Sequence, residues 1–354
     1  MTIGPVDLGF TGQKRPSRPA DEPKRTRTPR LDLARYSGVY VLAAFIIGYG
    51  LWVPETFLTS TTLQSILGDQ AVVGIVTVGV VIALSAGVFD LSFANNISMS
   101  GVLCGSLMYF HHFAPWQAIV ASLASGVVLA VVNAYFVVKV GLNSIVVTLG
   151  TSSVLLALTS WLSDNGQFIT GFPASFTRIA SPKPLGIPML TIIFAVVAFL
   201  GWYLLEHTPV GRRMQATGLG PDAARLAGVA TSRMTLIGFL VAGLTSSLAG
   251  VLVTAQVDSA IPTAGAGYLL PVVAGAFLGA TQFKPGRLNI AGTVLAIYLL
   301  ATGVKGLQLG GGGHAWITDA FNGVALLAAV TFAALSQRST GGLWRRLGFR
   351  RENV

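Results

Sequence analysis

The sequence predicts an all-α, polytopic membrane protein with about ten transmembrane helices. Hydrophobic residues make up 53% of the 354-residue chain and charged residues only 10%, which is more apolar material than one soluble core can bury. Lys and Arg gather in a few short segments, and long stretches carry no charge at all. This alternation of long apolar segments with polar connections is typical of membrane-spanning helices and their loops.

The net charge of +10 comes largely from three basic segments, at residues 14–35, 212–233 and 338–351. Each segment lies beside an apolar stretch. Positive residues next to membrane spans are retained in the cytoplasm, so membrane topology explains the basic charge and nucleic-acid binding is not expected. We therefore expect lipid, and no nucleic acid, among the partners.

The same charge pattern divides the chain into three regions. Residues 1–36 are rich in Pro, Arg, Thr and Asp and have no apolar core segment, so they predict a disordered cytoplasmic tail instead of a cleavable signal peptide. Residues 37–336 form the predicted transmembrane domain. Residues 337–354 form a second basic tail on the cytoplasmic side.

Within the transmembrane domain, apolar segments long enough to cross or nearly cross a bilayer predict the spans. Residues 55–69 are polar and are expected to lie outside. Four spans in 70–162 and four in 234–335 predict two repeated halves around the loop 206–233. The expected spans are 37–53, 70–88, 93–110, 116–138, 144–162, 185–205, 234–257, 268–280, 288–309 and 316–335.

The orientation of the loop 206–233 follows from two independent arguments. Six predicted crossings separate it from the N-terminal tail, so a cytoplasmic tail implies a cytoplasmic loop. Its arginines predict the same side. Both termini and this loop are therefore expected in the cytoplasm.

Asp90 is an acidic residue within a long apolar region, and Ser92 and Asn95 follow it closely. Acidic residues inside a membrane are costly and often mark a transport pathway. The alternative is structural, because Asp90 or Ser92 can cap the helix that follows. The two interpretations stay open, since a capped half-helix can also present its N-terminus to a polar solute.

A second group of polar residues surrounds Thr148 at the start of a predicted span. Hydroxyl groups in membrane helices mostly bond to their own backbone or to a neighbouring helix. Those that do not could line a hydrophilic path. Such a path suits a neutral polyol better than an ion, because no cluster of acids or bases is buried.

The predicted cytoplasmic loop contains a short helix. Pro221 stands at its first turn, and Asp222 lies near its positive N-terminal end. Gly228 follows its last turn, where a left-handed residue commonly ends a helix. The segment between them is compact and rich in alanine, including Ala223 and Ala224, which favours docking into a groove of a partner.

Catalytic and metal-binding motifs are not evident in the sequence. Cys104 is the only cysteine, so neither an intrachain disulfide nor a cysteine metal cluster can form. His111, His112, His207 and His314 show no metal-ligand spacing. The glycines at 310–313 are not followed by the Lys and Ser or Thr of a phosphate-binding loop. We expect no enzyme activity and no cofactor in this chain.

Several motifs, in order along the chain, resemble the ribose-type permease family of ABC importers. Val88–Ser92 is similar to the family's Gly-Ile-Asp-Leu-Ser, and Val146–Thr151 is similar to its Ile-Val-Thr-Leu-Gly-Thr. Asp222–Val229 is similar to its Glu-Ala-Ala-Arg-Leu-Ser-Gly-Ile. Phe89 stands where the family usually has Ile and places a bulkier ring beside Asp90. The resemblance covers nearly all of the chain after the N-terminal tail.

This resemblance implies the permease subunit of an importer in a bacterial inner membrane, carrying a monosaccharide or related polyol. It implies a second permease copy, an extracytoplasmic sugar-binding protein and cytoplasmic ABC ATPases that bind ATP and Mg²⁺. The helix in the loop would be the coupling helix, which docks on the ATPase. The implied coupling residues are Asp222, Ala223, Ala224, Arg225 and Gly228, and the implied path or gate residues are Phe89, Asp90, Asn95 and Thr148.

A secondary transporter is the competing interpretation, because repeated halves and broken helices also occur in that class. It requires a site for a coupling ion or proton. Acidic residues within the apolar regions are scarce: Asp90 is one, and Asp258 and Asp319 lie near the outer ends of spans. Dependence of uptake on ATP distinguishes the two mechanisms.

Overall fold

The computed structural model describes residues 36–163, 168–169, 171–284 and 286–346. The predicted tail 1–36, apart from Tyr36, and the last part of the predicted tail 337–354 lie outside the described residues. The prediction of an all-α protein is confirmed, because the described part contains fourteen α-helices and one pair of two-residue strands. Six helices are long and apolar enough to cross a membrane, and three shorter apolar helices accompany them.

The elements follow the chain in this order: α1 (Ser37–Trp52), α2 (Pro54–Phe57), α3 (Ser60–Ser85), α4 (Phe93–Tyr109), α5 (Pro115–Tyr135), the π-helix η1 (Phe136–Val140), α6 (Ser144–Ser163), β1 (Phe168–Ile169), α7 (Ala174–Thr177), the 3₁₀-helix η2 (Pro184–Gly186), α8 (Met189–Trp202), the π-helix η3 (Tyr203–His207), α9 (Pro209–Leu219), α10 (Pro221–Leu226), α11 (Thr231–Val257), β2 (Ser259–Ala260), the 3₁₀-helix η4 (Ala264–Tyr268), α12 (Leu269–Gly279), α13 (Ile290–Gly310) and α14 (Trp316–Arg346).

Most predicted spans agree with helices to within a few residues, and α3 and α14 are the two corrections. Helix α14 was expected to end at Leu335 but continues to Arg346, into the predicted tail 337–354. For α3, the expected span began at Gln70, but the helix begins ten residues earlier, at Ser60. Thr59 caps it by accepting a hydrogen bond from the Thr62 amide at 3.2 Å. Its other polar groups also find partners: the Ser65 hydroxyl donates to Asp69 and accepts a hydrogen bond from Lys305 of α13. A polar composition therefore did not prevent this segment from being helical.

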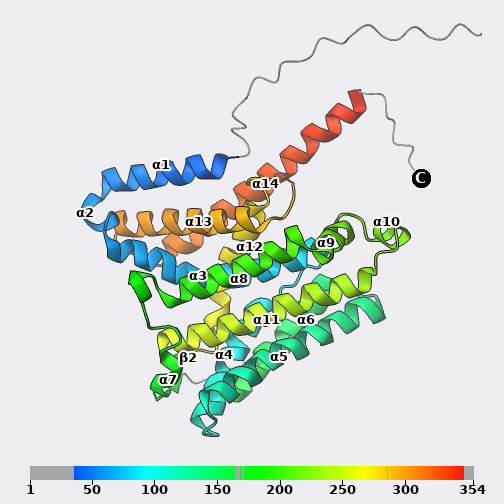
Figure 1. The fold of residues 1–354 in the computed structure, drawn as a ribbon. Helices are drawn as coiled ribbons and strands as arrows, with labels where there is room; N and C mark the ends of the chain where they lie inside the picture. Colours follow the sequence, from blue (N-terminus) through cyan, green and yellow to red (C-terminus); the bar gives the residue numbers. More distant parts are fainter. Residues whose placement is uncertain (1–35, 164–167, 170, 285, 347–354) are drawn as a thin grey trace, which may run out of the picture. The chain divides into compact units, whose positions relative to one another are not determined.

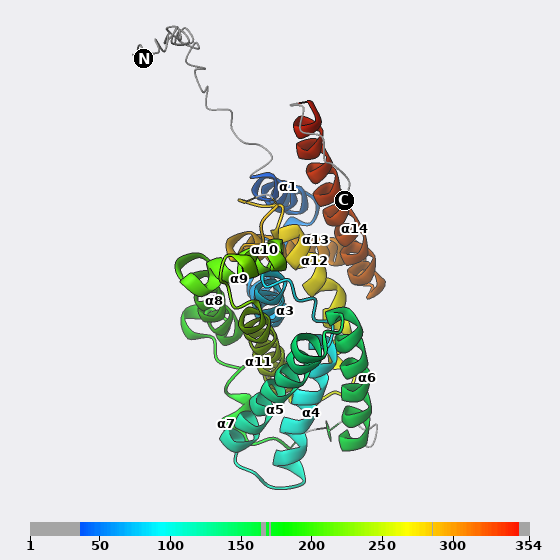
Figure 2. The same ribbon diagram turned by 90° about the vertical axis from the view of Figure 1, so that its right-hand side faces the viewer.

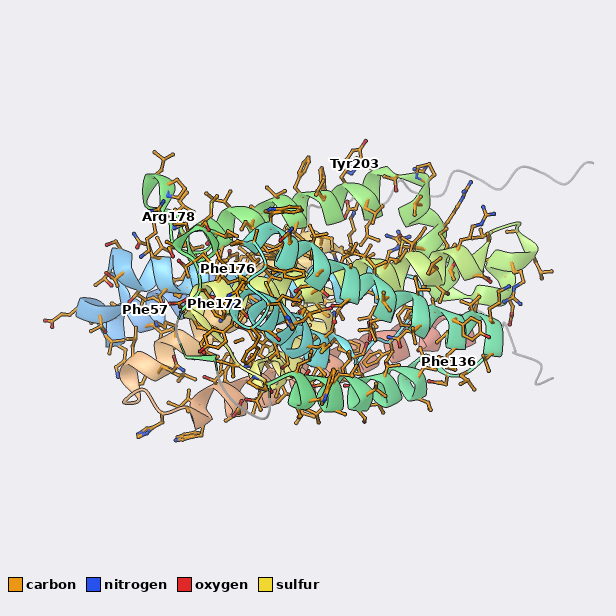
Figure 3. All side chains as sticks on the ribbon, turned by 90° about the horizontal axis from the view of Figure 1, so that it is seen from below. Phe57, Phe136, Phe172, Phe176, Arg178 and Tyr203 are labelled. Carbon is orange, nitrogen blue, oxygen red and sulfur yellow. The ribbon has the colours of Figure 1, made fainter. Side chains whose placement is uncertain are left out.

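The long helices share two common ends. At one end, the last turn of α8 leads through η3 and α9 into α10, and α11 begins directly after α10. Figure 1 places α10 at the right and α2 and α7 at the left. In Figure 3, Phe57 and Arg178 lie at one end of the bundle and Phe136 at the other. We call these the α10 end and the α7 end.

The centre of the bundle is built around α3 and α11. Helix α3 contacts α8, α11, α12 and α13, and Figure 2 shows it among these helices in a view from the α10 end. Helix α11 contacts α3, α4 and α5 along its length. Both helices are buried over most of their surface, whereas α5, α6 and α8 expose many apolar side chains of the kind that face lipid.

Small residues allow α11 to approach α4 and α5 closely. A β-carbon at Gly126 of α5 would meet the Gly243 carbonyl and the Ser247 hydroxyl of α11. A β-carbon at Gly250 of α11 would likewise meet the Ile97 carbonyl of α4. Because lipid removes most of the hydrophobic drive for helix association, such close backbone contact is a main source of packing energy in membranes.

We predict that Gly126→Ala destabilises the protein by about 1–3 kcal/mol, because the added methyl group must push α5 away from α11. The matched control is Gly150→Ala on α6, where a β-carbon meets nothing within 4 Å. That change should be neutral or slightly stabilising, since Ala favours a helix by up to ~1 kcal/mol over Gly. Thermal unfolding in detergent measures both, and equal midpoints for the two variants would contradict the packing argument.

Candidate functional site

The first part of the candidate site is the α9–α10 segment. Thr208 caps α9 by accepting a hydrogen bond from the Gly211 amide at 3.2 Å. Pro221 stands in the first turn of α10, and the chain leaves the helix through Gly228 at a φ of +82°. The predicted short helix with a proline start and a glycine end is therefore present, one turn and a half long.

The predicted coupling residues of α10 differ in exposure. Asp222, Ala223, Arg225 and Gly228 are exposed, whereas Ala224 is buried and its side chain packs inward. Arg225 and Asp222 form an ion pair at 3.8 Å on the helix surface, and an exposed pair of this kind adds little stability. Both charges therefore stay available to another molecule.

Two exposed leucines in this segment were missed by the sequence reasoning. Leu226, at the end of α10, is 92% exposed, and Leu219, at the end of α9, is also exposed. They add large apolar side chains to the charged surface of the α9–α10 segment. Their positions at the last residues of two short helices were the available signal.

The α10 segment is connected to the bundle by close contacts. Gly218 of α9 lies directly against the chain after α3, because a β-carbon there would meet the backbone of Ser85 and Gly87. Lys284, which follows α12, forms an ion pair with Glu206 of η3 at 2.7 Å. The α9–α10 segment is therefore in contact with the chain after α3, and η3, which precedes it, is tied to the chain after α12.

The second part of the site is the break between α3 and α4, where Asp90 lies. Its Oδ1 accepts hydrogen bonds from the Ser92 amide at 2.8 Å and the Ser92 hydroxyl at 2.6 Å. The Ser92 hydroxyl in turn accepts a hydrogen bond from Asn133 of α5 at 3.0 Å. Ser92 occupies the N-cap position of α4, but its side chain does not cap the helix. Asp90 instead closes a local turn and ties it to α5.

The other predicted path residues lie on the contact between this break, α4 and α6. The Phe89 amide donates to the Ser144 hydroxyl at 3.3 Å. The Thr148 hydroxyl donates mainly to the Ser144 carbonyl one turn earlier, at 2.8 Å. Asn95 donates to the backbone and hydroxyl oxygens of Ser152 at 3.0 and 2.8 Å. Asn95 thus holds α6 against α4, and Thr148 reaches the break through a longer hydrogen bond of 3.4 Å to the Phe89 carbonyl.

Phe89 also faces α12. Its ring centroid lies 6.4 Å from that of Phe277, and the two rings line a cavity of about 10 Å³ with Asp90. Val80 and Leu84 of α3 complete one wall. The space beside Asp90 therefore holds no more than about one water molecule and is closed by apolar side chains.

Asn96, beside the predicted Asn95, was missed and is the polar centre of the helix packing. Its amide nitrogen donates to the Gly243 carbonyl and to the hydroxyls of Ser246 and Ser247, all on α11. It is buried, and its Oδ1 accepts no hydrogen bond from a described residue. The sequence pair Asn95–Asn96 did not indicate which side chain faces which helix.

Metal binding and catalysis find no support in the described part of the chain. No group of three or more His, Cys, Asp or Glu side chains comes together there. What the geometry provides is a bundle of long apolar helices with the exposed helix α10 at one end, and with α9, which precedes it, against a break between two central helices. Such helices are typical of the class of multi-pass membrane proteins.

Comparison with known proteins gives the family. Residues 62–335 match the family described as branched-chain amino acid transport system / permease component. The match covers more than half of the chain, so the protein belongs to this family of ABC transporter permeases. Its permeases carry no ATPase site, which confirms the expectation that this chain is a transport subunit and not an enzyme.

Three relatives are similar over most of their length. The D-allose transport system permease protein of Escherichia coli K12 is 28% identical over 78% of this chain and 84% of its own. The ribose import permease protein of the same organism is 31% identical over 72% and 79%. The autoinducer 2 import system permease protein of Salmonella paratyphi B is 30% identical over 85% and 93%. No solved structure matches the chain.

We predict that Asp90→Asn leaves folding and transport nearly unchanged, whereas Asp90→Ala destabilises the protein by about 1–3 kcal/mol. Asn keeps the oxygen that accepts both Ser92 hydrogen bonds, and Ala leaves two buried donors without a partner. Thermal unfolding and solute uptake measure the difference. A folded Asp90→Asn protein without transport would show that the charge itself is needed.

Proposed function

We propose that this permease forms the path by which an ABC importer takes up a monosaccharide or related polyol. In this proposal an extracytoplasmic binding protein delivers the solute, and separate ATPase subunits, which bind ATP and Mg²⁺, drive its passage. Relatives with three different named substrates, ribose, D-allose and autoinducer 2, support the sugar-like class. Family membership favours this mechanism over ion-coupled secondary transport.

The proposed topology has about ten spans in a bacterial inner membrane, with both termini and the loop 206–233 in the cytoplasm. The α10 end is then the cytoplasmic end. The basic residues around α9 and α11 support this orientation, since Arg212, Arg213 and Arg233 all lie near it. A second permease copy and the repeat of 70–162 in 234–335 also belong to the proposal.

The single observation that carries the proposed mechanism is the exposed apolar end of α10 beside charged residues. Asp222, Ala223, Arg225 and Gly228 form its exposed surface, and Leu226 adds a large apolar side chain. A leucine left in water at the tip of a membrane protein has no lipid to cover it. Docking on the ATPase would bury this side chain and pair the nearby charges.

The contacts of α9 supply a route from the ATPase to the path. Movement of α10 shifts α9, and Gly218 of α9 lies against Gly87 in the break after α3. The break also contains Phe89 and Asp90, so its displacement would move the Phe89 ring relative to Phe277. In this mechanism Asp90, Asn95 and Thr148 position the gate through their hydrogen bonds, and the Phe89 ring closes it.

We predict that Leu226→Glu lowers recovery of the co-purified ATPase by about tenfold, which corresponds to a loss of ~1.4 kcal/mol in binding. A buried leucine contact would be replaced by a charge that must be desolvated. Affinity purification in mild detergent, with quantitative mass spectrometry of the partner subunits, measures the effect.

The matched control is Leu185→Glu, the same substitution at a fully exposed leucine in η2, before α8 at the α7 end. It should leave the amount of ATPase unchanged. Equal recovery of the ATPase with the Leu226 and Leu185 variants would show that α10 is not the docking surface. If no ATPase co-purified with the unmodified protein, the whole coupling proposal would be wrong.

We predict that Phe89→Ala raises ATP-independent leakage of solute through the assembled complex, because the small cavity between Phe89 and Phe277 would open. The control is Phe199→Ala, which removes an exposed aromatic ring on α8. Efflux of labelled sugar from proteoliposomes without ATP measures leakage. A tight Phe89→Ala complex with normal ATP-driven uptake would show that the ring only packs.

A further inference from the structure

A second cavity lies nearer the α7 end of the same two helices, α3 and α12. It has a volume of about 150 Å³ and is lined by polar groups from three elements: Gln70 of α3, Tyr268 of η4, and Thr318 and Asn322 of α14. Its apolar wall is formed mainly by α13, with Ile297, Leu300, Ala301 and Val304. None of these residues was predicted as part of a site.

Three of the four polar side chains, those of Gln70, Tyr268 and Asn322, make no hydrogen bond to another described residue. Asn322 is only 3% exposed, and Gln70 and Tyr268 are half-buried. Polar groups that meet at one cavity without a hydrogen bond to the protein supply hydrogen-bond partners for a polar ligand.

The fourth side chain is partly satisfied and still able to donate. The Thr318 hydroxyl oxygen accepts a hydrogen bond from the Gln308 amide at 2.9 Å, which leaves its hydrogen free. Together the amides of Gln70 and Asn322 and the Tyr268 hydroxyl offer both donors and acceptors. A ligand that carries several hydroxyl groups, each both a donor and an acceptor, matches this set.

The absence of charged side chains from the cavity lining favours an uncharged ligand. No Asp, Glu, Lys, Arg or His is among the residues that line it. Asp69 acts electrostatically on Tyr268, but no cationic side chain lines the cavity. A zwitterionic amino acid would therefore place its carboxylate there without an opposite charge, which is costly in an apolar region. A neutral sugar avoids this cost, and the ring of Tyr268 offers a flat surface for its C–H face.

We propose that this cavity binds the transported solute as a neutral polyhydroxylated molecule before it reaches the Phe89–Phe277 gate. The inference rests on the proposed function for its place in the transport path. Gln70 and Val73 of α3 line this cavity, and Val80 and Leu84 of the same helix line the gate. At a rise of 1.5 Å per residue, seven to fourteen residues place the cavity roughly 10–20 Å from the gate along α3.

The experiment labels a cysteine that is introduced into the cavity. The sole native cysteine, Cys104, is buried and therefore gives little background labelling. Asn322→Cys and the control Val324→Cys, 67% exposed on the same helix, are labelled with methyl methanethiosulfonate. The protein is held in phosphatidylcholine nanodiscs, so that neither a sugar detergent nor a glycolipid can occupy the cavity. Probes are D-ribose, D-allose and L-leucine.

The proposal expects at least one sugar to slow labelling of Asn322→Cys about threefold at twice its Kd, while Val324→Cys is unaffected. L-leucine should protect neither. Protection by L-leucine alone, equal protection of both positions, or an unreactive cysteine at Asn322 would overturn it. Should Asn322→Cys fail to fold, Gln70→Cys gives the same test. Because labelling requires no ATPase, its outcome is separate from that of the Leu226 experiment.

Discussion

The close contact of α11 with α3, α4 and α5 is the interaction on which the rest of the structure depends. Lipid provides no partner for a polar group, so the polar side chains of α4 must be satisfied by neighbouring helices. The amide nitrogen of Asn96 finds three oxygens of α11, and Gly126, Gly243 and Gly250 let the backbones come near enough. A well-fixed α4 in turn fixes the break before it, where Phe89 and Asp90 lie.

The break between α3 and α4 joins the two parts of the candidate site. It is held from one side by Asn133 and Ser144 and touched from the other by Gly218 of α9. In the proposed mechanism α9 displaces this seven-residue break, which is hydrogen-bonded to α5 and α6. The contacts of α9 would thereby connect the exposed helix α10 to the proposed gate.

Much of this could be predicted from the sequence, and the failures have physical causes. The lengths of the apolar segments predicted most helices, and Pro221 and Gly228 predicted where α10 begins and ends. The start of α3 was missed because Ser65, Asp69 and Lys305 are polar residues that satisfy one another across two helices. Leu226 and Asn322 were missed because exposure and the absence of a partner depend on which elements meet, and no local pattern reveals that.

The two cavities beside α3 differ in their chemistry. The proposed gate beside Asp90 is small and apolar, so in the proposed mechanism it excludes water and ions when closed. The cavity near the α7 end carries the hydrogen-bonding groups and no charge. In our proposals, the cavity near the α7 end selects the solute by its hydroxyl groups, and the rings of Phe89 and Phe277 close the path at a different level of α3. Because α12 also lines both levels, one displacement of its end beside Lys284 can alter the gate and the cavity together.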